Sequence, residues 1–284
     1  MRVIMQGMFR TAYQILRNNM IFIQPLLLYM LLVMSAAMYV AGKTMPLVAR
    51  IVLTACVVLL TIAFMTGWFY INKLGVDKYN PEDEQEVITK KTVESFKQFF
   101  SGIGENFFKM LFAFIIFGLI YVGVSYLVVQ LCLKFFGTPT IIMDFQNIAK
   151  MQTNTEIVAY LNNVSVDDKL NFISWVWTGI VLSSILNFFG VLYFSINTYE
   201  KRNVFVCLWK AFLFFFRKIL SSLAIILVLF FIYFFLNLLS LLLGANSFSF
   251  AILIILFTLY LNYYVLLVMW FYNEQTKNNS DSRA

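Results

Sequence analysis

The 284-residue chain has the composition of a membrane protein. Apolar residues make up 61% of it and charged residues 12%, whereas soluble globular domains average about 45–50% and about 25%. The net charge is +7, and the chain contains no histidine. This composition excludes an ordinary soluble domain, and the lack of histidine excludes Ser-His or Cys-His catalysis and removes the commonest metal ligand.

Long uncharged segments predict six transmembrane helices, because about 20 apolar residues cross a hydrocarbon core of about 30 Å. The expected spans are residues 20–42, 51–72, 110–133, 171–197, 219–243 and 248–272. The last two belong to one uncharged run that a turn signal at 244–247 divides. The runs are apolar on every face, which favours helices over a strand barrel. The predicted fold class is therefore all-α and polytopic, with one integral membrane domain over 1–284.

Residues 1–18 predict an amphipathic helix that lies in the membrane interface. Met8, Ala12 and Leu16 recur at helical spacing on one face, and Arg10 and Arg17 lie on the other. An alternative interpretation of the same residues is a transit peptide, because the segment contains arginines and no acidic residue. The segment is, however, poor in serine, which transit peptides usually contain.

Residues 81–100 predict a second interfacial helix. Asn80 can cap it, Pro81 suits its first position, and Lys90 and Lys97 follow at a seven-residue interval. Acidic residues near its beginning are expected to stabilise the positive end of the helix, as are Asp167 and Asp168 before the fourth span. The alternative role for both groups of acids is acid–base catalysis or metal binding. The acids near the beginning of this helix are Glu82, Asp83, Glu84 and Glu86.

Residues 134–169 form the expected external loop, with a short helix over 144–161 and a capping box at Ser165 and Asp168.

Residues 203–217 predict a third interfacial helix, in which Lys210 and Arg217 are again seven residues apart. Lys218 follows directly, before the fifth span. The chain therefore reads as three parallel repeats, each an interfacial helix followed by a two-span hairpin.

The basic residues predict the orientation. Positively charged connections stay on the cytoplasmic side. Most of the 21 Lys and Arg residues lie in alternate connections that share one side with both termini. The other side holds only Lys43, Arg50, Lys134, Lys150 and Lys169. Both termini are thus expected in the cytoplasm, and anchors at the membrane surface are expected at Arg10, Arg17, Lys90, Lys97, Lys210, Arg217 and Lys218.

Three basic elbows carry a resemblance to a known family. They read QILRNNMIFIQPLLLYMLL at 14–32, SFKQFFSGIGENFFKML at 95–111 and LWKAFLFFFRKIL at 208–220. In layout the chain resembles poorly characterised six-span bacterial membrane proteins related to the membrane domain of glycerophosphodiester phosphodiesterases. The resemblance implies a helical inner-membrane protein. It implies no phosphodiesterase chemistry in this chain and supplies no catalytic positions.

Uncharged polar residues at membrane depth are the candidate site residues. Such groups usually join helices, at about 1 kcal/mol or less each. The candidates are Gly179, Ser183 and Asn187 along one stripe of the fourth span, Asn237 and Asn262 in the last two spans, and Gln24 near the start of the first. The alternative is that Asn187, Asn237 and Asn262 line a cavity for a neutral or lipid-like ligand.

The sequence favours a membrane scaffold or accessory subunit of the bacterial cytoplasmic (inner) membrane. The rival is a transporter or permease subunit for a lipid or another uncharged solute. No spanning segment holds a charge in its interior, so neither an enzyme nor a cofactor or metal is expected. The expected partners are membrane lipids, including anionic headgroups at the cytoplasmic face, and an unidentified protein. A nucleic acid is not expected, since no basic patch with stacking aromatics lies outside the membrane segments.

Overall fold

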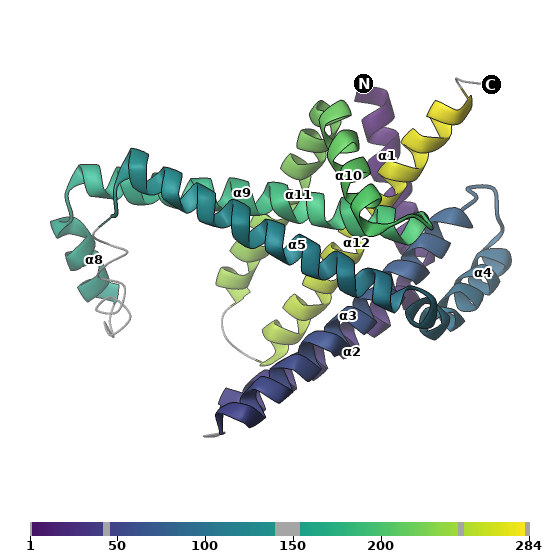
Figure 1. Cartoon of the computed structure of the whole chain (residues 1–284), viewed down its shortest axis with the longest axis horizontal. Helices are drawn as coiled ribbons and strands as arrows, with labels where there is room; N and C mark the ends of the chain where they lie inside the picture. Colours follow the sequence, from purple (N-terminus) through teal and green to yellow (C-terminus); the bar gives the residue numbers. More distant parts are fainter. Residues whose placement is uncertain (1, 42–45, 140–153, 244–246, 282–284) are drawn as a thin grey trace. The chain divides into compact units, whose positions relative to one another are not determined.

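The computed structural model describes residues 2–41, 46–139, 154–243 and 247–281, and these residues form helices and no strand. The elements are α1 (Arg2–Asn18), the short 3-10 helix η1 (Met20–Phe22), α2 (Ile23–Ala41), α3 (Leu47–Asp77), α4 (Gln85–Lys97), α5 (Phe99–Phe136), α8 (Asn154–Asn163), α9 (Val166–Tyr199), α10 (Val204–Arg217), α11 (Ile219–Leu243) and α12 (Ser247–Asp281). The all-α, polytopic fold class is confirmed (Figure 1). Residues 244–246 of the expected turn at 244–247 and residues 144–153 of the expected loop helix lie outside the described residues.

Five described helices are long and apolar enough to cross a membrane: α3, α5, α9, α11 and α12. A sixth span is reached when the bent pair Gly7–Asn18 and Met20–Ala36 is included. The two members of this pair meet at 78°. Asn19 lies at the junction, and its side-chain amide donates to the Ile15 carbonyl at 2.9 Å. A bend of this size makes the pair a broken span or a re-entrant segment.

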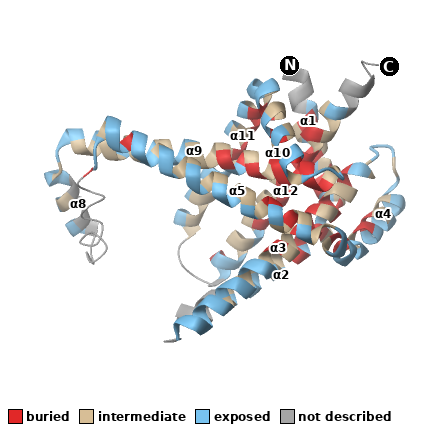
Figure 2. Ribbon diagram, in the orientation of Figure 1, coloured by how far each residue is buried: buried red, intermediate tan, exposed pale blue. Residues whose placement is uncertain are grey.

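The described chain divides into two compact units, and the larger comprises Met1–Ile115 and Phe188–Ala284. In it, α12 packs against α1, α2, α3 and α11, and α2 runs along α3. The buried residues gather around α12 and the neighbouring parts of α1, α3 and α9 (Figure 2). By contrast, Leu31 and Leu32 of α2 and the first turn of α3 are exposed. Apolar helix surfaces that are not covered by protein are typical of membrane proteins, where they face the lipid.

The smaller unit, Ile116–Asn187, holds the second half of α5, α8 and the first part of α9. Gly137 ends α5 with a φ of 68° and donates its amide to the Leu133 carbonyl at 3.1 Å, which is a glycine helix cap. The Trp175 indole donates to the Gly137 carbonyl at 2.9 Å. Ser165 accepts from the Asp168 amide at 3.2 Å, as the predicted capping box requires.

The order of short and long helices follows the expected threefold pattern, with α1, α4 and α10 each followed by two long helices, except that the short helix α8 lies between α5 and α9. Both boundaries of the second interfacial helix differ from the prediction. The helix expected over 81–100 begins at Gln85, because Asn80 closes a separate turn by accepting from the Glu82 amide at 3.2 Å. In addition, this helix ends at Lys97 rather than at residue 100, and α5 begins at Phe99 and continues unbroken through Gly102 and Gly104.

Two glycines of α5 make a matched test of how closely α3 and α5 pack. A Cβ added at Gly102 would lie 2.6 Å or less from the Cβ and Cγ of Tyr70, whereas a Cβ at Gly104 would meet nothing within 4 Å. We expect Gly102→Ala to lower the free energy of unfolding by about 1–3 kcal/mol through overpacking. Gly104→Ala should leave it unchanged or raise it by up to about 1 kcal/mol, since alanine favours helices. Thermal unfolding in detergent compares the two, and equal effects would contradict the close approach.

Candidate functional site

A group of charged and polar side chains surrounds Glu200, between α9 and α10. Glu200 is the only acid between Asp168 and Glu274. Its amide donates to the Ile196 carbonyl at 2.9 Å and so continues the last turn of α9. Asn203 then caps α10, its side chain accepting from the Phe205 amide at 3.0 Å. The two helix ends thereby hold the Glu200 carboxylate in a fixed place.

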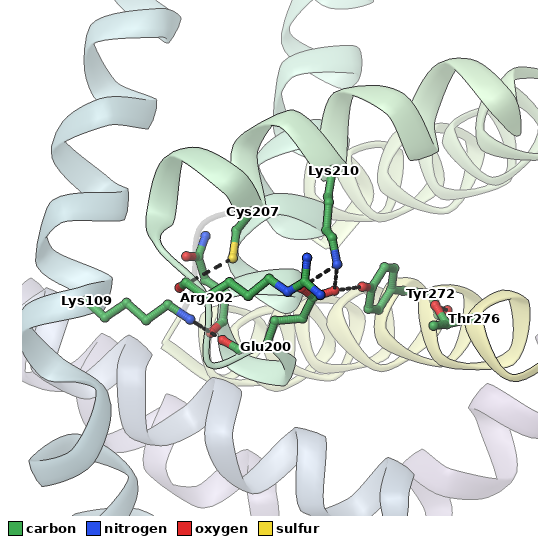
Figure 3. A network of polar contacts seen from close by, with 8 residues as sticks. Lys109, Glu200, Arg202, Cys207, Lys210, Tyr272 and Thr276 are labelled. Carbon is green, nitrogen blue, oxygen red and sulfur yellow. Dashed lines mark hydrogen bonds and ion pairs between the residues drawn. The ribbon is translucent and has the colours of Figure 1, made fainter. Parts of the chain in front are cut away.

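The carboxylate has partners from two helices and from the connection between α9 and α10, shown in Figure 3. Lys210 of α10 donates to both of its oxygens, at 2.7 and 2.8 Å. Tyr272 of α12 donates its hydroxyl to Oε1 at 2.6 Å. The Arg202 guanidinium lies 3.7 Å from Oε2. With 17% of the Glu200 side chain exposed, these are largely desolvated, charge-assisted contacts, which are the stronger kind.

Lys109 of α5 reaches the same place from the other side. Its ammonium donates to the backbone carbonyls of Asn197 (2.6 Å) and Glu200. These carbonyls end α9 and have no partner within the helix, so a cation suits them. The set Lys109, Glu200, Arg202, Lys210 and Tyr272, called the Glu200 cluster below, therefore connects α5, α9, α10 and α12.

The cluster is chemically suited to hold charge rather than to transfer protons. Burial alone raises the pKa of the Glu200 carboxyl. The hydrogen bonds from Lys210 and Tyr272 and the attraction of Lys210 and Arg202 outweigh that effect and place the pKa below its ordinary value of 4.5. Glu200 is thus ionised at neutral pH and is a weak base. Burial raises the pKa of the adjacent Cys207 thiol, which keeps it protonated and poorly nucleophilic.

The lowered pKa of Glu200 predicts how stability depends on pH. A carboxyl whose folded pKa lies below its unfolded value stabilises the fold fully above the unfolded pKa, and that contribution disappears as pH falls through the folded pKa. We therefore expect the melting temperature in detergent to fall between about pH 5 and pH 3. The fall should be smaller in a Glu200→Gln variant, and the difference between the two curves isolates this group. Parallel curves would contradict the assignment.

A second polar group lies where α1, α3 and α4 meet. Lys91 of α4 donates to Asp83 at 2.5 Å, and Thr92 donates to the Asn19 side chain at 3.0 Å. Tyr79, after α3, donates to Gln14 of α1 at 2.7 Å. The cavity between these elements encloses about 20 Å³, which is room for about one water molecule. The group joins helices and is too small to hold a lipid.

The predicted polar stripe on α9 belongs to the smaller unit and is largely uncovered there. Gly179 and Asn187 are exposed and Ser183 is half-buried. A Cβ added at Gly179 would meet nothing within 4 Å. The role of the Gly179, Ser183 and Asn187 stripe in helix packing, or in lining a ligand cavity, stays a prediction.

The other three predicted residues differ from one another in surroundings. Gln24 is exposed. Asn237 is half-buried and donates its amide to the Tyr233 carbonyl of its own helix at 2.8 Å. Asn262 is fully buried, and both its amide nitrogen and its amide oxygen lack a hydrogen-bond partner in the described structure. Asn262 is the unusual member, because an unsatisfied buried amide costs about 1–3 kcal/mol.

The predicted surface anchors are mostly accessible. Five are exposed, namely Arg10, Arg17, Lys90, Lys97 and Arg217, whereas Lys210 and Lys218 are half-buried. Lys210 is paired with Glu200, so its charge is compensated within the protein. Part of the expected membrane face of α1 is covered by protein, since Met8, Ala12 and Leu16 are buried where α1 packs on α12.

Sequence reasoning did not find Glu200, Lys109 or Tyr272. The available signal was a lone acid in a strongly basic connection, next to Lys201 and Arg202.

The described residues contain no group of three or more His, Cys, Asp or Glu side chains placed to hold a metal ion. Comparison with known proteins adds no family: no family model matches the chain, and neither the curated proteins nor the solved structures contain a significant match.

Proposed function

We propose that this membrane protein is a scaffold or accessory subunit of the bacterial cytoplasmic membrane, with both termini in the cytoplasm and no catalytic role. The apolar helices make it a membrane protein. The distribution of Lys and Arg supports the orientation. The layout of its three basic elbows also supports the proposed relation to the membrane domain of glycerophosphodiester phosphodiesterases.

The Glu200 cluster is the observation that favours a scaffold. It connects the C-terminal end of α9 to side chains from within α5, α10 and α12 through a bidentate ion pair, a short hydroxyl–carboxylate bond and a lysine cap. Alternating access requires one helix bundle to rock against another. Contacts that hold four helices together at one point oppose such movement and suit a fixed platform for partners.

Distance measurements in nanodiscs test whether the platform is fixed. Nitroxide labels attached through non-natural amino acids at Glu94 on α4 and Val206 on α10 report on two exposed positions in the larger unit and leave the native cysteines unchanged. A scaffold predicts one narrow distance distribution by double electron–electron resonance. Two resolved populations would favour the rival transporter or permease function.

A scaffold must also hold a partner. Extraction into native polymer discs, followed by quantitative protein and lipid analysis, should recover one protein at a constant ratio to this chain. Neutral lipid or solute at a constant ratio, without a protein, would support the transporter instead.

A further inference from the structure

One face of α10 is packed against protein. Cys207 and Ala211 are fully buried, and Phe215 is nearly so. The Phe215 ring lies 6.1 Å from Phe188 of α9, and the Phe214 ring lies 5.1 Å from Phe271 of α12. This inner face and the Lys210–Glu200 ion pair fix how α10 is rotated about its axis.

The opposite face of α10 is a strip of uncovered aromatic rings. Phe205, Trp209, Phe212 and Phe216 are 63%, 60%, 43% and 52% exposed. Their spacing of four, three and four residues places them on one side of the helix. The Trp209 and Phe212 rings are stacked at 5.6 Å, and the Phe212 and Phe216 rings lie 4.5 Å apart. The rings therefore form a continuous strip, about 17 Å long at 1.5 Å per residue.

Charge indicates what covers the strip. The helix contains no acid, and uncompensated cations stand at its two ends. Lys201 precedes α10 and Arg217 ends it, and both are exposed. Lys210, at the middle, is neutralised by Glu200. Aromatic rings flanked by cations match a bilayer interface, where rings lie below the headgroups and cations bind anionic phosphates. A helix that docked on an acidic protein would more naturally present free cations along its centre.

We propose that α10 is a monotopic anchor that inserts Phe205, Trp209, Phe212 and Phe216 into an anionic leaflet, with Lys201 and Arg217 binding lipid phosphate. The anchor rests on the membrane location of the proposed scaffold but not on its immobility or its partner. It changes the interpretation of the predicted anchor Lys210, which positions the helix through Glu200, while the residues at the helix ends bind the headgroups.

Lipid quenching of tryptophan fluorescence tests insertion. The full-length protein and its Trp209→Phe variant are placed in nanodiscs of phosphatidylglycerol and phosphatidylcholine with bromines at either shallow or deep acyl positions. The difference between the two proteins gives the quenching of Trp209. We expect strong quenching by shallow bromines and less by deep ones. Quenching by neither would overturn the proposal, whether water or a co-purified protein covers Trp209.

Lipid selectivity tests the charges. In Lys201→Gln/Arg217→Gln, the preference for spin-labelled phosphatidylglycerol over phosphatidylcholine should fall about fivefold for each charge removed. Lys134→Gln/Lys169→Gln is the matched control, with the same loss of charge at the expected external side, and its preference should change little. Equal losses would overturn the assignment of the headgroups to α10. A mobile platform or a missing partner would contradict the scaffold alone and leave both lipid readouts as expected.

Discussion

Replacing Glu200 by glutamine should lower the free energy of unfolding by about 2–4 kcal/mol, among the largest effects of any single polar substitution in this chain. The variant leaves the half-buried Lys210 ammonium without its counter-charge and weakens the acceptor for the Tyr272 hydroxyl. Removing one partner of a buried ion pair costs about 3–5 kcal/mol, and the partial exposure of Lys210 reduces that figure. Chemical or thermal unfolding in detergent measures the loss.

Two sets of variants serve as comparisons for the stability loss in Glu200→Gln. Glu94→Gln, on the exposed surface of α4, makes the same chemical change and should alter stability by less than about 0.5 kcal/mol. Lys210→Met and the double variant complete a cycle that measures the coupling between Glu200 and Lys210. We expect the double variant to be more stable than the sum of the single losses predicts. Strict additivity would show that the ion pair does not brace α10.

The cluster shows why part of this protein can be predicted from its sequence and part cannot. Span α11 occupies residues 219–243 as expected, because its apolar run is bounded by Lys218 on one side and a turn signal on the other. Both ends of this helix are therefore set by residues next to it in the sequence. Glu200, by contrast, meets Tyr272 and Lys109, which are 72 and 91 residues away. Nothing in the residues beside Glu200 encodes those partners, since they depend on how the helices pack.

The same limit applies to helix faces. The sequence of the third interfacial helix cannot decide which of its apolar residues face protein, because Phe205, Phe212, Phe215 and Phe216 are the same residue type on nearby positions. In the structure Phe215 faces inward and Phe216 outward. A helix that is apolar nearly all round carries no sequence signal for its rotation, and here the Lys210–Glu200 pair supplies it. The pair is therefore the link between the scaffold proposal and the membrane anchor.

Asn262→Leu should stabilise the protein, with a gain of about 1 kcal/mol or more. Asn262 is fully buried in α12, and neither end of its amide finds a partner in the described structure. Leucine has the same side-chain branching and needs no hydrogen bond, so the desolvation penalty of about 1–3 kcal/mol disappears. Part of that gain is lost because the methyl groups are larger than the amide atoms.

The matched control is Asn237→Leu on the neighbouring helix α11, where the amide is bonded to Tyr233 of its own helix. This substitution removes a satisfied group at a half-buried position, so its effect should be small. Both melting temperatures are measured in the same detergent. A loss of stability in Asn262→Leu alone that exceeds the overpacking cost of about 1–3 kcal/mol would indicate that the amide is satisfied by an internal water or a bound polar molecule. Such a guest beside α12 would in turn weigh against a purely structural role for this helix and favour the transporter.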